Sequence, residues 1–260
     1  MRGFLNSLVR PFGYRVIRQR PKIDPDISSD ADFMRIFEAC DPYTMTSIER
    51  MYGLYLAVRH VVENDGPGDI VECGVWMGGS TMGAAMTLDL MGDTRRQLNL
   101  YDTFEGMTAP TDMDVDHTGA HAKDFLDPDE KIDGASNVWA YASLEMVRQN
   151  LDRTGFPPDR FHLVKGKVEE TIPADMPAVI SLLRLDTDWY ESTAHELKYL
   201  YPVLSSGGVL IIDDYGHWRG SREATDEYFT EHGGILLNRM DYSGRMGVKA
   251  CRSQRSPSLV

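Results

Sequence analysis

The sequence predicts an α/β fold in which a mostly parallel sheet carries helices on both of its faces. Short apolar runs alternate with helical patterns from residue 69 onward, which is the arrangement of doubly wound sheets. The run Val179 to Leu185 is nearly all apolar, as is typical of a strand buried on both faces. Most of the predicted strands end in polar, mostly acidic residues, at the edge where open α/β sheets bind their ligands.

A basic segment and a helical pattern precede the predicted sheet. Residues 1–22 carry six basic side chains and no acidic one, which favours a flexible arm; a second interpretation is an arm that docks on an acidic partner subunit or a membrane surface. The segment lacks the apolar stretch and cleavage site of a signal peptide. Apolar spacing predicts one helix from Ile36 to Glu63, which Gly66-Pro67-Gly68 ends. We divide the chain into a basic arm with a helical extension (1–65), a main domain (66–252) and a disordered tail (253–260).

The elements of the main domain follow in order. The predicted strands are Asp69 to Cys73, Leu98 to Tyr101, Phe161 to Val164, Val179 to Leu185 and Val209 to Ile212. The predicted helices are Ser80 to Leu90, Ala140 to Thr154, Glu191 to Leu204 and Ser221 to His232, followed by apolar pieces that suit a closing hairpin. Thr103 to Asn137 is polar and irregular, and a segment of that length is either a functional loop or disorder.

The composition argues against several classes of function. Acidic residues outnumber basic ones 40 to 27, for a net charge of −13, and such a surface repels the phosphates of a nucleic acid. The same excess of acid suits a protein that binds cations. The three cysteines lack the spacing of a zinc or redox motif, so we interpret them as reduced thiols in the cytoplasm. No apolar run is long enough to form a transmembrane segment.

A glycine-containing turn, Gly74 to Gly79, follows the first predicted strand. Glycines allow a tight turn and the close approach of a ligand, and the helix that follows presents free N–H groups. Trp76 stands where the dinucleotide fingerprint GxGxxG has its second glycine, so a pyrophosphate would be obstructed. Asp102 ends the second strand, where an acid accepts hydrogen bonds from a ribose. The two features together favour a nucleoside-containing cofactor; alternatively, the turn is a plain connection and Asp102 caps a helix.

Three aspartates end the fourth and fifth predicted strands. Asp186 follows the fourth, and Asp213 and Asp214 follow the fifth, so neighbouring strand ends would bring them together. Carboxylates crowded into a cleft repel one another unless a cation neutralises them, and their oxygens suit magnesium or calcium. The alternative is a set of separate caps and surface acids.

The histidines are less informative. His217 lies close to the aspartate pair and is a candidate general base. His195 lies within a predicted helix and is interpreted as structural or solvated. His117 and His121 lie in the long loop, where they either contact substrate or are solvated.

Four segments together resemble the macrocin O-methyltransferase family (TylF, MycF and NovP type). They are Val71-Glu72-Cys73-Gly74-Val75-Trp76, Asp102-Thr103-Phe104-Glu105-Gly106, Leu185-Asp186-Thr187-Asp188 and Ile211-Ile212-Asp213-Asp214-Tyr215. The resemblance extends from about Tyr43 to about Lys249 and is specific only as a set. The basic arm, the segment Thr108 to Asn137 and the C-terminal end match nothing in it. Because the unmatched loop is expected to select the substrate, the resemblance says least about specificity.

The resemblance implies a class I methyltransferase (Rossmann-like) fold with about seven strands, the last of them antiparallel. It implies methylation of sugar hydroxyls, often on glycosylated natural products, with S-adenosylmethionine and magnesium as cofactors. The implied cofactor-binding residues are Glu72, Gly74, Val75, Ser80, Asp102, Thr103 and Phe104. The implied metal ligands are Asp186, Asp213 and Asp214, and Asp188 keeps the second acid of the family's Asp-x-Asp pattern. We also expect a homo-oligomer, a dimer or larger, with the arm and the first helix as contacts.

The expected reaction is a direct displacement at the methyl carbon of the cofactor. A sugar hydroxyl is a poor nucleophile, and a divalent cation that binds two adjacent oxygens would lower its pKa. Asp188 or His217 would remove the proton, with Asp186 as a third candidate. Two rival functions stay open: a catechol or phenol O-methyltransferase of the same fold, and a non-catalytic protein that binds the cofactor. A dehydrogenase is disfavoured because Trp76 breaks the phosphate turn.

Overall fold

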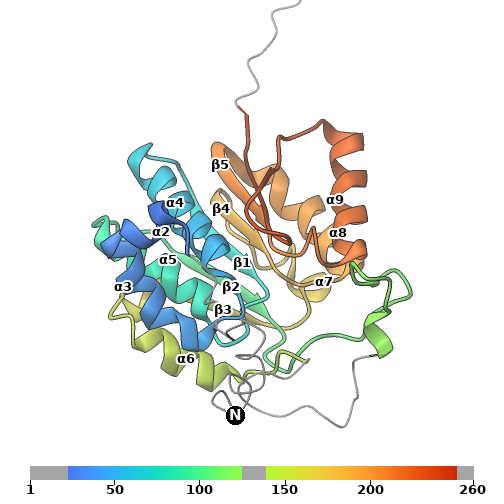
Figure 1. The fold of residues 1–260 in the computed structure, drawn as a ribbon, viewed down its shortest axis with the longest axis horizontal. Helices are drawn as coiled ribbons and strands as arrows, with labels where there is room; N and C mark the ends of the chain where they lie inside the picture. Colours follow the sequence, from blue (N-terminus) through green and yellow to red (C-terminus); the bar gives the residue numbers. More distant parts are fainter. Residues whose placement is uncertain (1–22, 125–138, 251–260) are drawn as a thin grey trace, which may run out of the picture.

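A computed structural model describes residues 23–124 and 139–250 as a seven-stranded sheet covered by helices on both faces (Figure 1). The strand order is β3-β2-β1-β4-β5-β7-β6, in which β1 to β5 are parallel and β7 runs antiparallel to β5. This confirms the predicted fold class. Within the described residues, no helix is both long enough and apolar enough to cross a membrane.

The element bounds are as follows. The strands are β1 Asp69–Cys73, β2 Leu98–Asp102, β3 Phe161–Lys165, β4 Ile180–Leu185, β5 Leu204–Ile212, β6 Asn238–Arg239 and β7 Arg245–Val248. The α-helices are α2 Pro25–Ser29, α3 Ala31–Cys40, α4 Ile48–Glu63, α5 Gly79–Leu90, α6 Leu144–Asp152, α7 Val168–Thr171, α8 Tyr190–Leu200 and α9 Arg219–His232. Short 3-10 helices are η2 Asp41–Tyr43, η3 Ala122–Asp124, η5 Pro158–Arg160 and η6 Tyr201–Val203.

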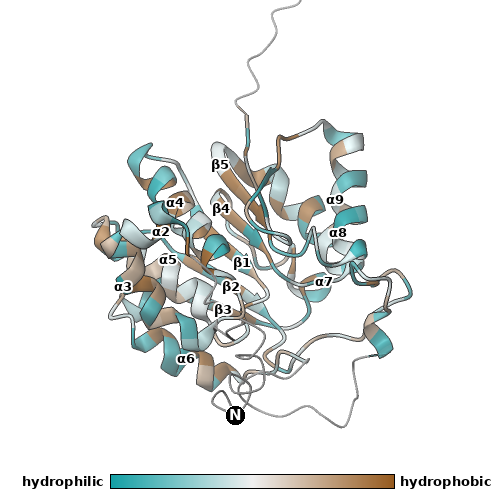
Figure 2. Cartoon of the chain, in the orientation of Figure 1, coloured by the Kyte–Doolittle hydropathy of each residue, from teal (hydrophilic) through white to brown (hydrophobic). Residues whose placement is uncertain are grey.

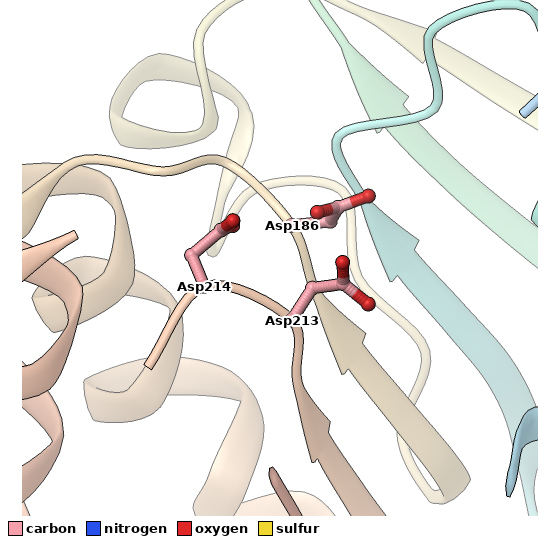
Figure 3. Close-up of side chains that lie close together, drawn as sticks. All are labelled: Asp186, Asp213 and Asp214. Atoms are coloured by element: carbon pink, nitrogen blue, oxygen red, sulfur yellow. The ribbon is translucent and has the colours of Figure 1, made fainter. Parts of the chain in front are cut away.

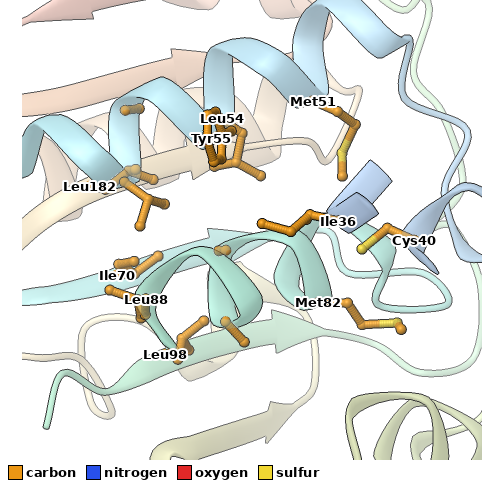
Figure 4. Packing of buried hydrophobic residues seen from close by; sticks show 14 of the residues in the cluster. Ile36, Cys40, Met51, Leu54, Tyr55, Ile70, Met82, Leu88, Leu98 and Leu182 are labelled. Atoms are coloured by element: carbon orange, nitrogen blue, oxygen red, sulfur yellow. The ribbon is translucent and has the colours of Figure 1, made fainter. Parts of the chain in front are cut away.

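Successive residues of the central strands face two separate cores. Leu182 packs with α4 and α5 on one face, while Leu183 packs with α8 on the other. Figure 2 shows hydrophobic residues along β4 and β5, and Figure 4 shows Leu54, Leu88 and Leu182 packed between the sheet, α4 and α5. Burial on both faces explains the nearly continuous apolar run of β4.

The helical extension differs from its prediction, because the single helix expected from Ile36 to Glu63 is two helices. α3 ends at Cys40, and the 3-10 turn η2 contains Pro42, whose ring nitrogen carries no hydrogen for a helical bond. The next helix, α4, begins after Ser47, whose hydroxyl accepts a hydrogen bond from the N–H of Arg50 at 3.2 Å. Thr46, in the chain between the two helices, accepts a hydrogen bond from Arg184 of β4 at 3.1 Å.

Other predicted elements are present with shifted bounds. β5 begins at Leu204 rather than Val209, because Gly207 and Gly208 lie within the strand instead of ending the element before it. Gly207 has a φ of +80° and donates its N–H to Lys249 O at 2.8 Å. The helix expected from Ala140 begins at Leu144, after Ser143, whose hydroxyl accepts from Met146 N at 3.3 Å. α8 and α9 each begin slightly earlier than predicted.

Several predicted features lie outside the described residues. These are the basic arm (1–22), the part of the long loop at 125–138, the tail and Cys251. Cys40 and Cys73 are free thiols and both are buried. The helical extension (α2 to α4) contributes Phe33, Ile36 and Val58 to the same core cluster as β1 and β2; the division of the chain at residue 65 stays a prediction.

Candidate active site

A cavity of about 400 Å³ opens at the carboxyl ends of β1, β2, β4 and β5. One half of it is lined by the glycine turn after β1, the end of β2 and the segment after β3. The other half is lined by the residues that follow β4 and β5. This is the edge of the sheet where the sequence places its acidic residues.

The glycine turn is shaped by contact between main chains. Gly74 has a φ of +82°, and a Cβ atom built on it would lie 1.9 Å from the backbone oxygen of Asp186. The N–H of Asp186 donates to Cys73 O at 2.9 Å, so β1 and β4 remain in contact past their last residues. Only glycine satisfies both the backbone angle and the space at this position.

Asp102 holds the turn from the end of β2. Its Oδ2 accepts hydrogen bonds from the N–H groups of Val75 and Trp76 at 2.7 and 3.0 Å, and its Oδ1 accepts from Phe104 N at 2.7 Å. Burial raises the pKa of Asp102, and these N–H donors oppose the rise. Trp76 has a φ of +47° and lines the cavity, so the residue that breaks the dinucleotide fingerprint is a wall of this site.

Five of the seven predicted cofactor-binding residues line the cavity: Gly74, Val75, Ser80, Asp102 and Thr103. Glu72 and Phe104 do not line it, and their assignment as cofactor-binding residues stays a prediction. The Glu72 carboxylate is buried and accepts hydrogen bonds from Arg184, at 2.6 Å, and from the Thr81 hydroxyl. Phe104 is buried in the hydrophobic core, where removal of its phenyl ring from water stabilises the fold.

The structure brings Asp186, Asp213 and Asp214 together. Each offers a carboxylate oxygen, and the three oxygens lie within 4.8 Å of one another at the ends of β4 and β5 (Figure 3). Oδ2 of Asp214 is buried and has no hydrogen-bond partner among the described residues. Burial raises the pKa values of Asp186 and Asp214 well above the ordinary range, and the neighbouring carboxylates raise them further. These three carboxylates repel one another, and one of their oxygens lacks a hydrogen-bond partner. A hard divalent cation, which prefers oxygen ligands, fits such a site.

Two arginines contact this cluster, and neither was predicted. Arg184 of β4 donates to Asp213 Oδ1 at 2.8 Å and pairs with Asp186 Oδ2 at 2.7 Å. Arg50 of α4 pairs with Asp213 Oδ2 and, through Nε, with Asp241 Oδ2 at 3.0 Å. Burial lowers the pKa of Arg50, but Asp213 and the other nearby aspartates outweigh it and leave that pKa raised. Arg184 is the one charged residue in the otherwise apolar run Leu182 to Leu185. A charge in a buried strand is the signal by which the sequence could have identified it.

Asp188 lies in the cavity beside an aromatic pair. Its Oδ1 accepts a hydrogen bond from the indole N–H of Trp218 at 2.6 Å, and its φ is +67°. Trp218 meets Trp189 edge to face at 5.0 Å, and both rings line the cavity. Burial raises the pKa of Asp188 to about 8, with a further contribution from Asp186. Asp188 is therefore positioned to hold a proton.

His217 also lines the cavity, within a cluster of rings. Its Nδ1 lies 3.2 Å from the hydroxyl of Tyr242, and its ring lies 5.1 Å from that of His117. Burial, and next the proximity of His117, lower the pKa of His217, so its neutral form dominates at neutral pH. The structural interpretation of His195 fits its position, because its Nε2 lies 2.9 Å from Ile172 O. His121 belongs to a β-bridge with Val115.

Three further walls of the cavity were not predicted. They are Tyr43 to Thr46 from the extension, Gly166 to Glu169 after β3, and Tyr242 with Ser243 from the closing hairpin. Tyr43 lies against the glycine turn so closely that a Cβ atom on Gly79 would be 2.5 Å from Tyr43 O. No local pattern marks these segments, because their place in the site depends on long-range packing.

Comparison with known proteins gives a consistent result. A family model described as macrocin-O-methyltransferase (TylF) matches residues 35–245. The chain is 36% identical over 191 residues to the 8-demethyl-8-(2,3-dimethoxy-alpha-L-rhamnosyl)-tetracenomycin-C 4'-O-methyltransferase of Streptomyces olivaceus, which covers 74% of this chain and 69% of that protein. It is 32% identical over 191 residues to the mycinamicin III 3''-O-methyltransferase of Micromonospora griseorubida, covering 74% and 72%.

The fold is similar to a solved structure of the same kind. The structure of the O-methyltransferase NovP aligns with a TM-score of 0.69 at 29% sequence identity, over 80% of this chain and 83% of that chain. The family match runs from residue 35 to residue 245 and therefore includes the residues that line both halves of the cavity.

Proposed function

Because the chain belongs to the macrocin-O-methyltransferase family, we propose that it transfers the methyl group of S-adenosylmethionine to a sugar hydroxyl of a small molecule. A divalent cation, magnesium by preference, assists the reaction. The observation that carries the proposal is one continuous cavity that joins the glycine turn to the aspartate cluster. The name of the Streptomyces olivaceus relative includes a rhamnosyl group, which supports a sugar as acceptor.

The glycine-turn half would hold the cofactor. Gly74 and Val75 present main chain to the cavity, and Ser80 lies in the first turn of α5, where N–H groups are available to a carboxylate. Asp102 and Thr103 lie at the end of β2, where a ribose would be held. Trp76 takes the place of a glycine and leaves too little space for a pyrophosphate. The turn therefore suits a cofactor that has no pyrophosphate.

The aspartate half would hold the cation and the acceptor. Asp186, Asp213 and Asp214 are the proposed ligands, and their carboxylate oxygens are the donors that magnesium prefers. When bound, the cation would lower the pKa of the attacking hydroxyl and stabilise the developing negative charge. The walls formed by Trp189 and Trp218 would exclude water and orient the acceptor.

The proton of the attacking hydroxyl has three proposed acceptors in this half. His217 is neutral at neutral pH because burial lowers its pKa. Asp188 is held in place by the Trp218 indole and faces the same cavity, and a cation bound nearby would lower its raised pKa so that it can accept a proton. Asp186 is the third candidate if a metal ligand also takes the proton.

The first test is calorimetric binding of S-adenosylhomocysteine with and without magnesium, followed by turnover assays on glycosides and on catechols. Micromolar binding and turnover of glycosides only would support the proposal. Turnover of catechols only would show that the acceptor is a phenol and not a sugar. Absence of binding under both conditions would refute the enzyme's use of this cofactor.

Asp186→Ala separates the two halves of the site. We expect magnesium-dependent turnover to fall by at least about 100-fold, because one ligand of the cation is lost. We expect the dissociation constant of S-adenosylhomocysteine to change by less than about threefold, because no side chain of the cofactor half is altered. Asp89→Ala, at the exposed end of α5, is the matched control. Full turnover of Asp186→Ala, or of the wild type in EDTA, would contradict the metal assignment.

A further inference from the structure

Asp213 is held between two guanidinium groups. Arg184 occupies its Oδ1, at 2.8 Å, and Arg50 occupies its Oδ2. Its main-chain oxygen accepts a further hydrogen bond from the Ser243 hydroxyl at 2.7 Å. Asp213 is 2% exposed, so both oxygens meet cations rather than water. A divalent cation that binds Asp213 must therefore compete with a positive charge that is already in contact.

The two arginines differ in how firmly they are placed. Arg184 is 3% exposed, projects from the middle of the sheet and also pairs with Glu72 and Asp186. Its loss would leave several buried acids without a counter-charge. Arg50 comes from α4, outside the sheet, and its side chain is among those that line the cavity. It has more room to move than Arg184 does.

Arg50 also has a second acidic partner away from the cluster. Its Nε lies 3.0 Å from Asp241 Oδ2. Asp241 is fixed in turn by the Ser47 hydroxyl at 2.8 Å and by the N–H groups of Ser243 and Gly244 at 2.8 and 2.7 Å. Asp241 belongs to the closing hairpin and is no part of the aspartate cluster. The guanidinium can therefore release Asp213 and stay paired with Asp241.

We propose that Arg50 is an exchangeable counter-ion of the aspartate cluster. In the metal-free protein it neutralises Asp213 and keeps the site assembled, and on metal binding it turns from Asp213 to Asp241. Metal affinity is therefore set by the helical extension, which contributes Arg50, as well as by the strand ends, which contribute the ligands. This inference rests on the proposed metal site and deepens it.

The direction of the effect follows from charge. A guanidinium beside Asp213 Oδ2 repels an incoming divalent cation and occupies one of its donors. Removal of the charge takes away both obstacles, while Arg184 and Ser243 still position Asp213. We expect neutral variants of Arg50 to bind a divalent cation about tenfold more tightly, after allowance for the screening of charges near the surface.

The test measures binding of manganese(II), by calorimetry and by its electron paramagnetic resonance signal, to the full chain with S-adenosylhomocysteine present. Arg50→Met is expected to lower the dissociation constant about tenfold, and Arg50→Lys, which keeps the charge, to leave it within about threefold of the wild type. Arg59→Met, on the same helix but away from the cavity, is the control. Arg50→Gln replaces Arg50→Met if the latter does not fold.

Thermal unfolding supplies a second readout that a merely structural arginine would not give. The neutral variant is expected to have a lower Tm than the wild type without metal, and this difference is expected to shrink at saturating manganese. Equal or weaker manganese binding by both neutral variants would overturn the proposal while leaving the metal site intact. If the wild type binds S-adenosylhomocysteine but no manganese, the metal part of the proposed function fails and this inference fails with it.

Discussion

The two halves of the cavity are built by different means. The half at β1 and β2 is held in shape by main-chain contacts, with Gly74 against the backbone of Asp186 after β4 and Asp102 accepting N–H groups of the turn. The half at β4 and β5 is made of charged side chains, in which Arg184 and Arg50 offset the aspartates. A main-chain site is sensitive to added volume, because the backbone around it cannot yield. A charged site is sensitive to lost counter-charge, because an unpaired buried charge costs several kcal/mol.

Arg184→Met should produce the largest effect and tests the charged half. Glu72, Asp186 and Asp213 would lose their shared counter-charge at a site that is 3% exposed. We expect the free energy of unfolding to fall by about 3–5 kcal/mol, measured by urea denaturation at neutral pH.

The matched control is Arg59→Met, which removes an exposed pair between Arg59 and Glu63 on α4. Its expected cost is below about 1 kcal/mol, because water screens exposed charges. Similar losses in the two variants would break the comparison, since charge balance would then not hold this half together.

Gly74→Ala tests the main-chain half, with an expected loss of about 3 kcal/mol in the free energy of unfolding. The added Cβ would lie 1.9 Å from Asp186 O, at a φ of +82°. The ends of β1 and β4 would separate, so binding of S-adenosylhomocysteine, measured by calorimetry, should weaken as well.

Gly92→Ala isolates the cost of the backbone angle. Gly92 has a φ of +74°, yet a Cβ atom there would meet nothing within 4 Å. Its expected cost is therefore only about 1–2 kcal/mol, with no effect on ligand binding. Equal losses at the two glycines would show that the close approach of β1 and β4 is not what requires Gly74.

Asp241→Asn should have the smallest effect and sharpens the comparison at the hairpin partner of Arg50. Burial raises the pKa of Asp241, but the Gly244 N–H, Arg50 and the Ser47 hydroxyl outweigh it and lower that pKa below its ordinary value. A carboxylate whose pKa is lower in the folded state stabilises the fold above its unfolded pKa of about 4. That contribution is lost as the pH falls through the folded-state value.

We therefore expect Asp241→Asn to cost about 1 kcal/mol at pH 7, from the weakened hydrogen bonds. The difference from the wild type should stay constant down to about pH 5 and shrink below about pH 4. Urea denaturation at a series of pH values measures it. A difference that grew towards acid pH would contradict the assigned direction of the pKa.

The site was partly predictable because some of its residues are marked by local patterns. Asp186, Asp213 and Asp214 follow apolar runs, and in parallel sheets the ends of neighbouring strands share one edge. Glu72 is marked in the same way, since it also stands near the end of a strand. Side chains alternate along a strand, however, and Glu72 points to the face that contains Arg184. Position near a strand end was therefore not sufficient to place a residue in the cavity.

Arg50 and the Tyr43 to Thr46 segment show what local patterns cannot reveal. The helical spacing around Arg50 predicts a helix, and that helix is present. The break at Pro42, which directs the chain across the glycine turn, was missed because the apolar spacing on both sides of it continues. Arg50 and Asp213 are 163 residues apart, so only the packing of α4 against the sheet places them in contact.

By itself, the sequence determined the alternation of strands and helices, the glycine turn and the placement of acids at the strand ends. These features follow from side-chain periodicity and backbone freedom, which act over a few residues. Only the tertiary structure decided which acids face the cavity, which arginines neutralise them and which part of the extension closes the site. Those choices depend on contacts between residues far apart in the chain, and their free energies arise only when burial removes the groups from water.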